Sequence, residues 1–215
     1  MKISPTLTEV KEIAKTGKYD ILPVSCEILS DFITPIEAMR ILQNVSTHCY
    51  LLESAQANEA WGRYTFLGYD PKLEINCIDG HMKLGKLSVE TENPSEYIRQ
   101  ILSEYKSPKF DYLPSFTGGL VGYFSYDYLG YKEKSIRGKA RDTEDFKDVD
   151  LMLFDKVIAF DNLCQKIILI ANMSLDAPET GYNKAIVELK QLRELLMHGE
   201  KKQNMGGKLL GDVTP

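Results

Sequence analysis

The chain has 215 residues, of which 43% are hydrophobic and 27% are charged, and its formal net charge is −5. This composition is typical of a globular domain, and the sequence has no basic stripe that would suit nucleic acid. The longest apolar runs, such as residues 167–171, are too short to span a bilayer, and the first residues lack a signal-peptide pattern. We therefore expect a cytoplasmic chain without nucleic-acid or membrane partners.

The N-terminal part predicts a capped helix followed by a strand. Thr6 and Glu9 form a capping box at the start of a helix over residues 6–16. Residues 20–29 predict a strand that is interrupted at Pro23.

The next segment predicts a second capped helix and several strands. Thr34 and Glu37 form another capping box. Residues 49–53 and 63–69 favour strands, and Asp79-Gly80 is a hairpin signal between two further strands.

The remaining sequence predicts two more helices and a second hairpin. A third helix begins at Asn93, and a last helix covers residues 182–198. Asp161-Asn162 separates two apolar strands. The sequence therefore predicts an α+β fold with mainly antiparallel sheets built from hairpins and about four helices.

Two segments of the sequence contain several glycines each. Residues 117–123 contain three glycines between apolar residues but match no phosphate-binding motif, so we expect these glycines to permit close packing. Residues 200–215 lack apolar periodicity and predict a linker after a domain of residues 1–199.

One pair of segments suggests a ligand. Glu53 and Ser54 end an apolar strand, and Arg63 and Tyr64 begin the next predicted strand. A carboxylate, a hydroxyl, a cation and a ring together suit a free amino acid. A plain ion pair between Glu53 and Arg63 is the structural alternative.

The chain resembles the N-terminal region of anthranilate synthase component I, a chorismate-using enzyme family. The order and spacing of four stretches carry this resemblance over nearly the whole chain. They are Leu51-Leu52-Glu53-Ser54, residues 61–68, residues 114–124 and residues 155–161.

The resemblance implies a regulatory domain whose tryptophan-binding residues are Leu52, Glu53, Ser54, Arg63 and Tyr64. It implies that the residues binding chorismate and magnesium belong to a C-terminal half that is missing here, so we expect no catalytic residue and no cofactor in this chain. The expected partners are tryptophan, that missing half and a glutaminase subunit that supplies ammonia.

Two other functions remain open at this point. The chain also resembles the N-terminal part of aminodeoxychorismate synthase component I, which shares this architecture. Alternatively, it is an interaction module that binds no ligand and docks the glutaminase subunit.

Overall fold

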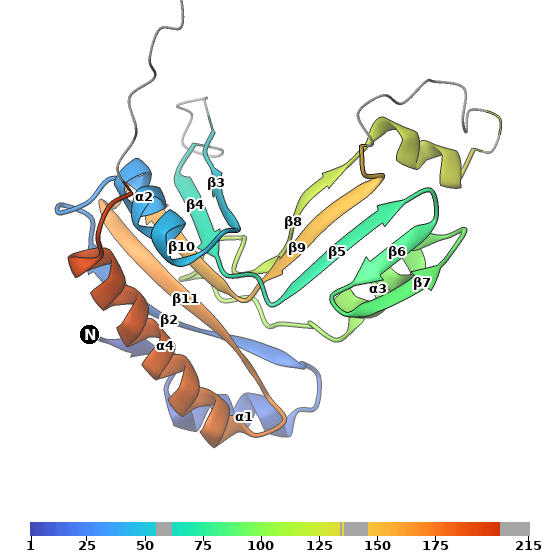
Figure 1. Ribbon diagram of the computed structural model, residues 1–215. Helices are drawn as coiled ribbons and strands as arrows, with labels where there is room; N and C mark the ends of the chain where they lie inside the picture. The colour runs from blue at the N-terminus through green and yellow to red at the C-terminus, as the bar shows by residue number, and fades with distance from the viewer. Residues whose placement is uncertain (55–61, 134, 136–145, 203–215) are drawn as a thin grey trace, which may run out of the picture.

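The computed structural model describes residues 1–54, 62–133, 135 and 146–202 and confirms the α+β class with two antiparallel sheets (Figure 1). In chain order the described elements are β1 (Ile3–Ser4), α1 (Leu7–Lys15), β2 (Ile21–Leu29), α2 (Pro35–Val45), β3 (Cys49–Leu52), β4 (Tyr64–Tyr69), β5 (Leu73–Ile78), β6 (His81–Leu84), β7 (Leu87–Glu90), α3 (Pro94–Ser103), β8 (Gly119–Phe124), the 3-10 helix η1 (Tyr126–Tyr131), β9 (Val149–Phe154), β10 (Lys156–Asp161), β11 (Lys166–Ser174) and α4 (Pro178–His198).

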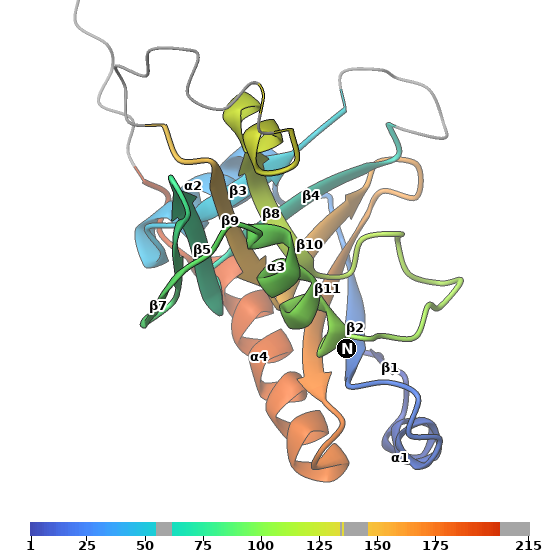
Figure 2. The same cartoon turned by 90° about the vertical axis from the view of Figure 1, so that its right-hand side faces the viewer.

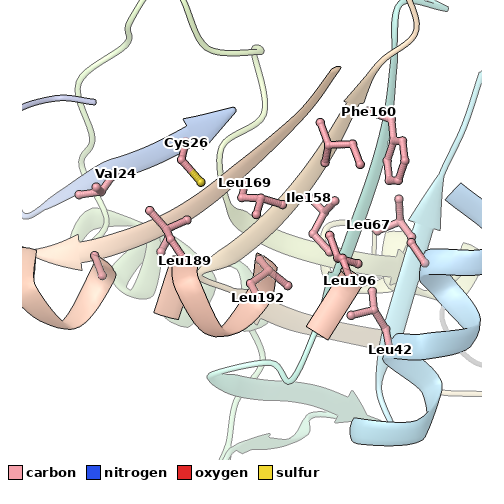
Figure 3. Close-up of a cluster of buried hydrophobic side chains, with 14 of the residues drawn as sticks. Val24, Cys26, Leu42, Leu67, Ile158, Phe160, Leu169, Leu189, Leu192 and Leu196 are labelled. Atoms are coloured by element: carbon pink, nitrogen blue, oxygen red, sulfur yellow. The ribbon is translucent and has the colours of Figure 1, made fainter. Parts of the chain in front are cut away.

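The larger sheet has the strand order β1-β2-β11-β10-β4-β3. Helix α4 packs along β11 and β2, with α1 and α2 near its two ends (Figure 1). Ile158, Phe160 and Leu169 of the central strands lie in the same buried cluster as Leu189 and Leu192 of α4 (Figure 3). Burying each such side chain stabilises the fold by roughly 1.5–3 kcal/mol, so this cluster dominates the core.

The opposite face of the same sheet has its own apolar cluster. Because successive strand residues point to opposite faces, Val157 and Ile168 lie away from α4. They are buried together with Leu113, and Phe116 packs against them from the segment that connects α3 to β8. The central strands are therefore apolar on both faces, which agrees with the continuous hydrophobic runs in their sequences.

The smaller sheet has the strand order β7-β6-β5-β9-β8 and is covered by α3 (Figure 2). Ile98 of α3 is buried in one cluster with Ile75, Met82 and Leu151 of the sheet. This second core is separate from the one beneath α4.

The chain passes between the two sheets at two adjacent points. A short link joins β4 to β5, and Asp155 alone joins β9 to β10. The side-chain amide of Asn172 donates to the carbonyl oxygens of Asp155 (3.0 Å) and Thr117 (2.6 Å), and its backbone N–H also donates to Asp155 (2.8 Å). Beside it, the Lys156 ammonium pairs with Asp70 at 2.8 Å. These contacts fix the junction from which the sheets diverge (Figure 1).

The predicted helix starts agree closely with the structure. The Thr6–Glu9 and Thr34–Glu37 capping boxes are both present, and each carboxylate accepts from the backbone N–H of its threonine. The predicted third helix is α3, and α4 begins at Pro178, earlier than predicted, because proline suits a first helical turn.

The predicted interruption at Pro23 is wrong, since β2 runs through it without a break. Pro23 lies opposite Asn172 of β11, whose backbone N–H donates away from β2, to Asp155. On its other side β2 pairs with β1 only at Ser25 and Cys26, so the sheet edge is open at Pro23. A residue without an N–H is therefore tolerated there.

The packing role predicted for the glycine-containing stretch is confirmed at Gly122. A Cβ atom at this position would overlap the carbonyl group of Asp150 on the neighbouring strand β9. Gly122 also has a φ of 152°, which disfavours L side chains. The Asp79-Gly80 hairpin between β5 and β6 is confirmed as well.

Replacing Gly80 with valine should destabilise the chain, because Gly80 has a φ of 84° and a β-branched residue is strained there. We expect urea denaturation to show a loss of about 1–3 kcal/mol in the free energy of unfolding. Lys83→Val, at an exposed position of β6, is the matched control and should change that value by less than about 0.5 kcal/mol. Equal stability of the Gly80 variant and the parent chain would contradict the requirement for a left-handed turn.

Candidate ligand-binding site

The five predicted site residues lie at one corner of the larger sheet. Leu52 is the last residue of β3, which forms the sheet edge, and Glu53 and Ser54 follow it. Arg63 directly precedes Tyr64, the first residue of β4. Because β3 and β4 are antiparallel, the end of one strand meets the start of the other, so the structure brings the two segments together.

Glu53 contacts β4 through a threonine. Its Oε1 atom accepts a hydrogen bond from the buried hydroxyl of Thr65 at 3.4 Å. The side-chain amide of Asn162 donates to the same hydroxyl oxygen at 3.4 Å. Since Thr65 and Tyr64 are neighbours in a strand, the contacted hydroxyl and the Tyr64 ring lie on opposite faces of β4.

Arg63 forms a bidentate ion pair at this corner, and its partner is Asp161. The guanidinium donates from Nε to Oδ1 of Asp161 at 3.1 Å and from Nη2 to Oδ2 at 2.7 Å. Asp161 ends β10 and lies opposite Tyr64 in the register of β4. The Arg63 side chain is 35% exposed, whereas the Asp161 side chain is fully buried. The bidentate geometry makes this a strong, directional pair.

Further donors stabilise the charged form of Asp161. The backbone N–H groups of Leu163 and Cys164 donate to its Oδ1 atom at 3.2 and 3.1 Å. Burial alone would raise the pKa of Asp161, but the hydrogen bonds from Arg63 and from Cys164 outweigh it and lower the pKa to about 2. The same pairing raises the pKa of Arg63, so both groups stay charged at neutral pH.

The structure therefore does not contain the alternative ion pair between Glu53 and Arg63, because the guanidinium is bound by Asp161. In the sequence, Asp161 belongs to a hairpin signal and ends the fourth stretch of the family resemblance, and neither pattern indicates a contact with Arg63. It lies 98 residues from Arg63, so only the pairing of β4 with β10 reveals the contact.

Aromatic side chains extend from the corner along one face of the sheet. The Arg63 guanidinium lies 4.9 Å from the centroid of the Tyr64 ring, a cation–π distance. The Tyr64 and Phe66 ring centroids are 5.8 Å apart, and Phe66 meets Phe116 edge to face at 5.6 Å. Residues 55–61, which include Trp61 of the second motif, lie outside the described residues.

Comparison with known proteins agrees with the resemblance seen in the sequence. The chain is 34% identical over 198 residues to anthranilate synthase component 1 of Acetivibrio thermocellus, covering 89% of the chain and 39% of that protein. It is 36% identical over 196 residues to the component 1 of Pseudomonas aeruginosa, covering 87% of the chain and 39% of that protein. No family model matches the chain.

A solved structure gives the same result. The chain matches the crystal structure of anthranilate synthase component I from Streptococcus pneumoniae with a TM-score of 0.50 and 25% sequence identity. This match covers 77% of the chain and 36% of the solved chain.

These comparisons confirm that the chain is similar to part of anthranilate synthase component 1. The chain spans about two fifths of the length of these relatives. The relatives do not favour the aminodeoxychorismate synthase alternative. Among the helices of the described residues, none is long and apolar enough to cross a membrane.

Replacing Asp161 with asparagine should lower the free energy of unfolding by about 1.5–3 kcal/mol at pH 7, because the charge-assisted bonds to Arg63 are lost. Asp127→Asn, at an exposed position of η1, is the control and should be neutral. Urea denaturation of both variants at several pH values measures the effect.

The difference in the free energy of unfolding between the parent chain and the Asp161→Asn variant should also depend on pH. The pKa of Asp161 is about 2 in the folded chain and ~3.9 in an unfolded one. Its contribution is therefore fully present above the unfolded value and is lost as the pH falls from about 4 to 2. A difference that stays constant down to pH 2 would contradict the assigned charge state.

Proposed function

We propose that this chain is the regulatory N-terminal part of an anthranilate synthase component 1 and that it binds tryptophan as a feedback inhibitor. The complete enzyme would convert chorismate and ammonia, taken from glutamine, to anthranilate and pyruvate. The observation that carries the proposal is the convergence of Leu52, Glu53, Ser54, Arg63 and Tyr64 at the paired ends of β3 and β4.

The corner supplies groups that match the parts of tryptophan. The exposed Glu53 carboxylate would accept hydrogen bonds from the ammonium group, and the Ser54 hydroxyl would bond a polar atom beside it. Leu52, which is 48% exposed, and the Tyr64 ring would contact the indole on the other face of the paired strands, so the ligand would lie across the sheet edge at β3. Apolar contact provides most of the binding free energy, and the polar contacts orient the ligand.

Arg63 has a positioning role in this proposal. Its guanidinium is already neutralised by Asp161, so it is a poor counter-charge for a ligand carboxylate. The pair instead fixes the start of β4 against the end of β10. Arg63 thereby holds Tyr64 and Thr65 in place, and Thr65 in turn contacts Glu53.

Catalysis is assigned to the part of component 1 that this chain does not span. The resemblance places the chorismate residues and a magnesium ion there, and a glutaminase component would deliver the ammonia. Within the described ranges, no group of three or more His, Cys, Asp or Glu side chains is arranged to hold a metal ion.

A thermal-shift titration separates ligand binding from a purely structural interaction module. A ligand that binds only the native state stabilises it by about 2.7 kcal/mol when its concentration is 100 times its dissociation constant. Free L-tryptophan should therefore raise the melting temperature of the chain in a saturable way, whereas a module without a ligand would not respond.

Replacing Ser54 with phenylalanine in the full-length enzyme should relieve tryptophan inhibition and leave turnover of chorismate largely intact. Loss of one hydrogen bond costs only about 1 kcal/mol, but the larger side chain would also occlude the corner. Ser103→Phe, at the exposed end of α3, is the control and should leave inhibition unchanged. Unchanged tryptophan inhibition in the Ser54 variant would refute the assigned site.

The chain by itself should convert no chorismate, and it should bind tryptophan more weakly than the full-length enzyme. Feedback requires a coupling free energy of about 1–3 kcal/mol between the two sites, and that coupling needs both parts of the enzyme. Calorimetric titration of both proteins and a turnover assay test this expectation. Equal tryptophan affinities would show that the pocket is complete in these residues, and turnover by the chain would refute the assignment of catalysis elsewhere.

A further inference from the structure

A groove lies at the other edge of the larger sheet, where β1 and α1 face the segment that follows α3. Its volume is about 420 Å³, within the range of roughly 300–1,000 Å³ that is usual for small-molecule sites. Eight residues line it, among them Pro5, Glu9, Glu12, Phe110 and Tyr112. The site proposed above lies at the opposite edge strand, β3, so the two are independent.

The walls of this groove are mainly apolar and aromatic. The rings of Phe110 and Tyr112 stack with centroids 5.1 Å apart and an interplanar angle of 23°. Tyr112 is 45% exposed, and Pro5 and Ile13 add apolar surface. Exposed ring faces attract both apolar groups and cations.

The charged residues that line the groove are all acidic. Glu9 and Glu12 lie nearly one turn apart on α1, and none of the eight lining residues is Lys, Arg or His. Glu9 uses its Oε2 atom to accept from the backbone N–H and the hydroxyl of Thr6, each at 2.7 Å. Burial and, less strongly, the Glu9 charge raise the pKa of Tyr112 to about 12. The groove therefore favours a cation and repels an anion.

Glu12 already has a competing cation. Its Oε1 atom pairs with the ammonium of Lys15 at 2.6 Å, and both side chains are well exposed, at 65% and 70%. Exposed pairs of this kind contribute little to stability, so a ligand cation held between Glu12 and the rings can replace Lys15.

We propose that this groove is a binding site for a small arylalkyl-ammonium compound, whose ammonium group lies at Glu12 and whose ring packs against Tyr112 and Phe110. Free amino acids are excluded as good ligands, because their carboxylate would lie beside Glu9 and Glu12. The two carboxylates, the stacked rings and the absence of any cation among the lining residues together define this specificity.

The test is an amide-resolved NMR titration of the whole chain with 2-phenylethylammonium chloride at constant ionic strength. Saturable shifts are expected at the amides of Thr8, Glu12 and Tyr112, and 3-phenylpropanoate should not produce them. Shifts that do not saturate, or equal shifts with the anion, would overturn the proposal. L-Tryptophan, observed at Leu52 and Arg63, reports on the other site, so failure of one proposal is distinguishable from failure of the other.

Variants of Glu12 and of its partner Lys15 give a second measurement. Glu12→Gln should weaken binding of 2-phenylethylammonium by about 2- to 5-fold, as expected for one exposed charge pair. Lys15→Ala should tighten it by a similar factor, because it frees Glu12. Lys18→Ala, beyond the end of α1, is the matched control for lost charge and should change the affinity less. Equal effects of the two lysine variants would overturn the role of Glu12. All these positions are exposed, so the folded amide spectrum should be retained.

Discussion

The buried carboxylate of Asp161 is the constraint on which the candidate site depends. A charge removed from water must be paired and hydrogen-bonded, and Asp161 meets this requirement with Arg63 and two backbone amides. The pair joins the residue that precedes β4 to the last residue of β10, and so determines where Tyr64 and Thr65 lie. Arg63 is of a type that suggests ligand binding, but its pairing with Asp161 stabilises the corner that the ligand would occupy.

The junction between the two sheets is a second constraint. Each sheet has its own apolar core, and the Asn172 side chain donates both to Asp155, which joins β9 to β10, and to Thr117, which lies just before β8. Lys156 and Asp70 add an ion pair at the same junction. Polar contacts and the edge-to-face packing of the buried Tyr50 and Phe154 rings, 4.7 Å apart, thus set together how the sheets meet.

Local signals in the sequence predicted much of the fold. The Thr6 and Thr34 capping boxes and the Asp79-Gly80 turn depend on residues a few positions apart, so periodicity and turn chemistry suffice to find them. The tolerance of β2 for Pro23 was missed because it depends on how little of β1 pairs there. The partner of Arg63 also depends on long-range structure. Strand order brings Asp161 to Arg63, and no short-range sequence pattern encodes strand order.

We propose that tryptophan binds at the corner formed by β3 and β4. Isotope-filtered NOE spectra of the labelled chain with unlabelled L-tryptophan test this proposal, because they report which protons lie next to the indole. NOEs are expected from the indole to the methyl groups of Leu52 and to the ring of Tyr64. Saturable binding with NOEs only to residues away from this corner would contradict it.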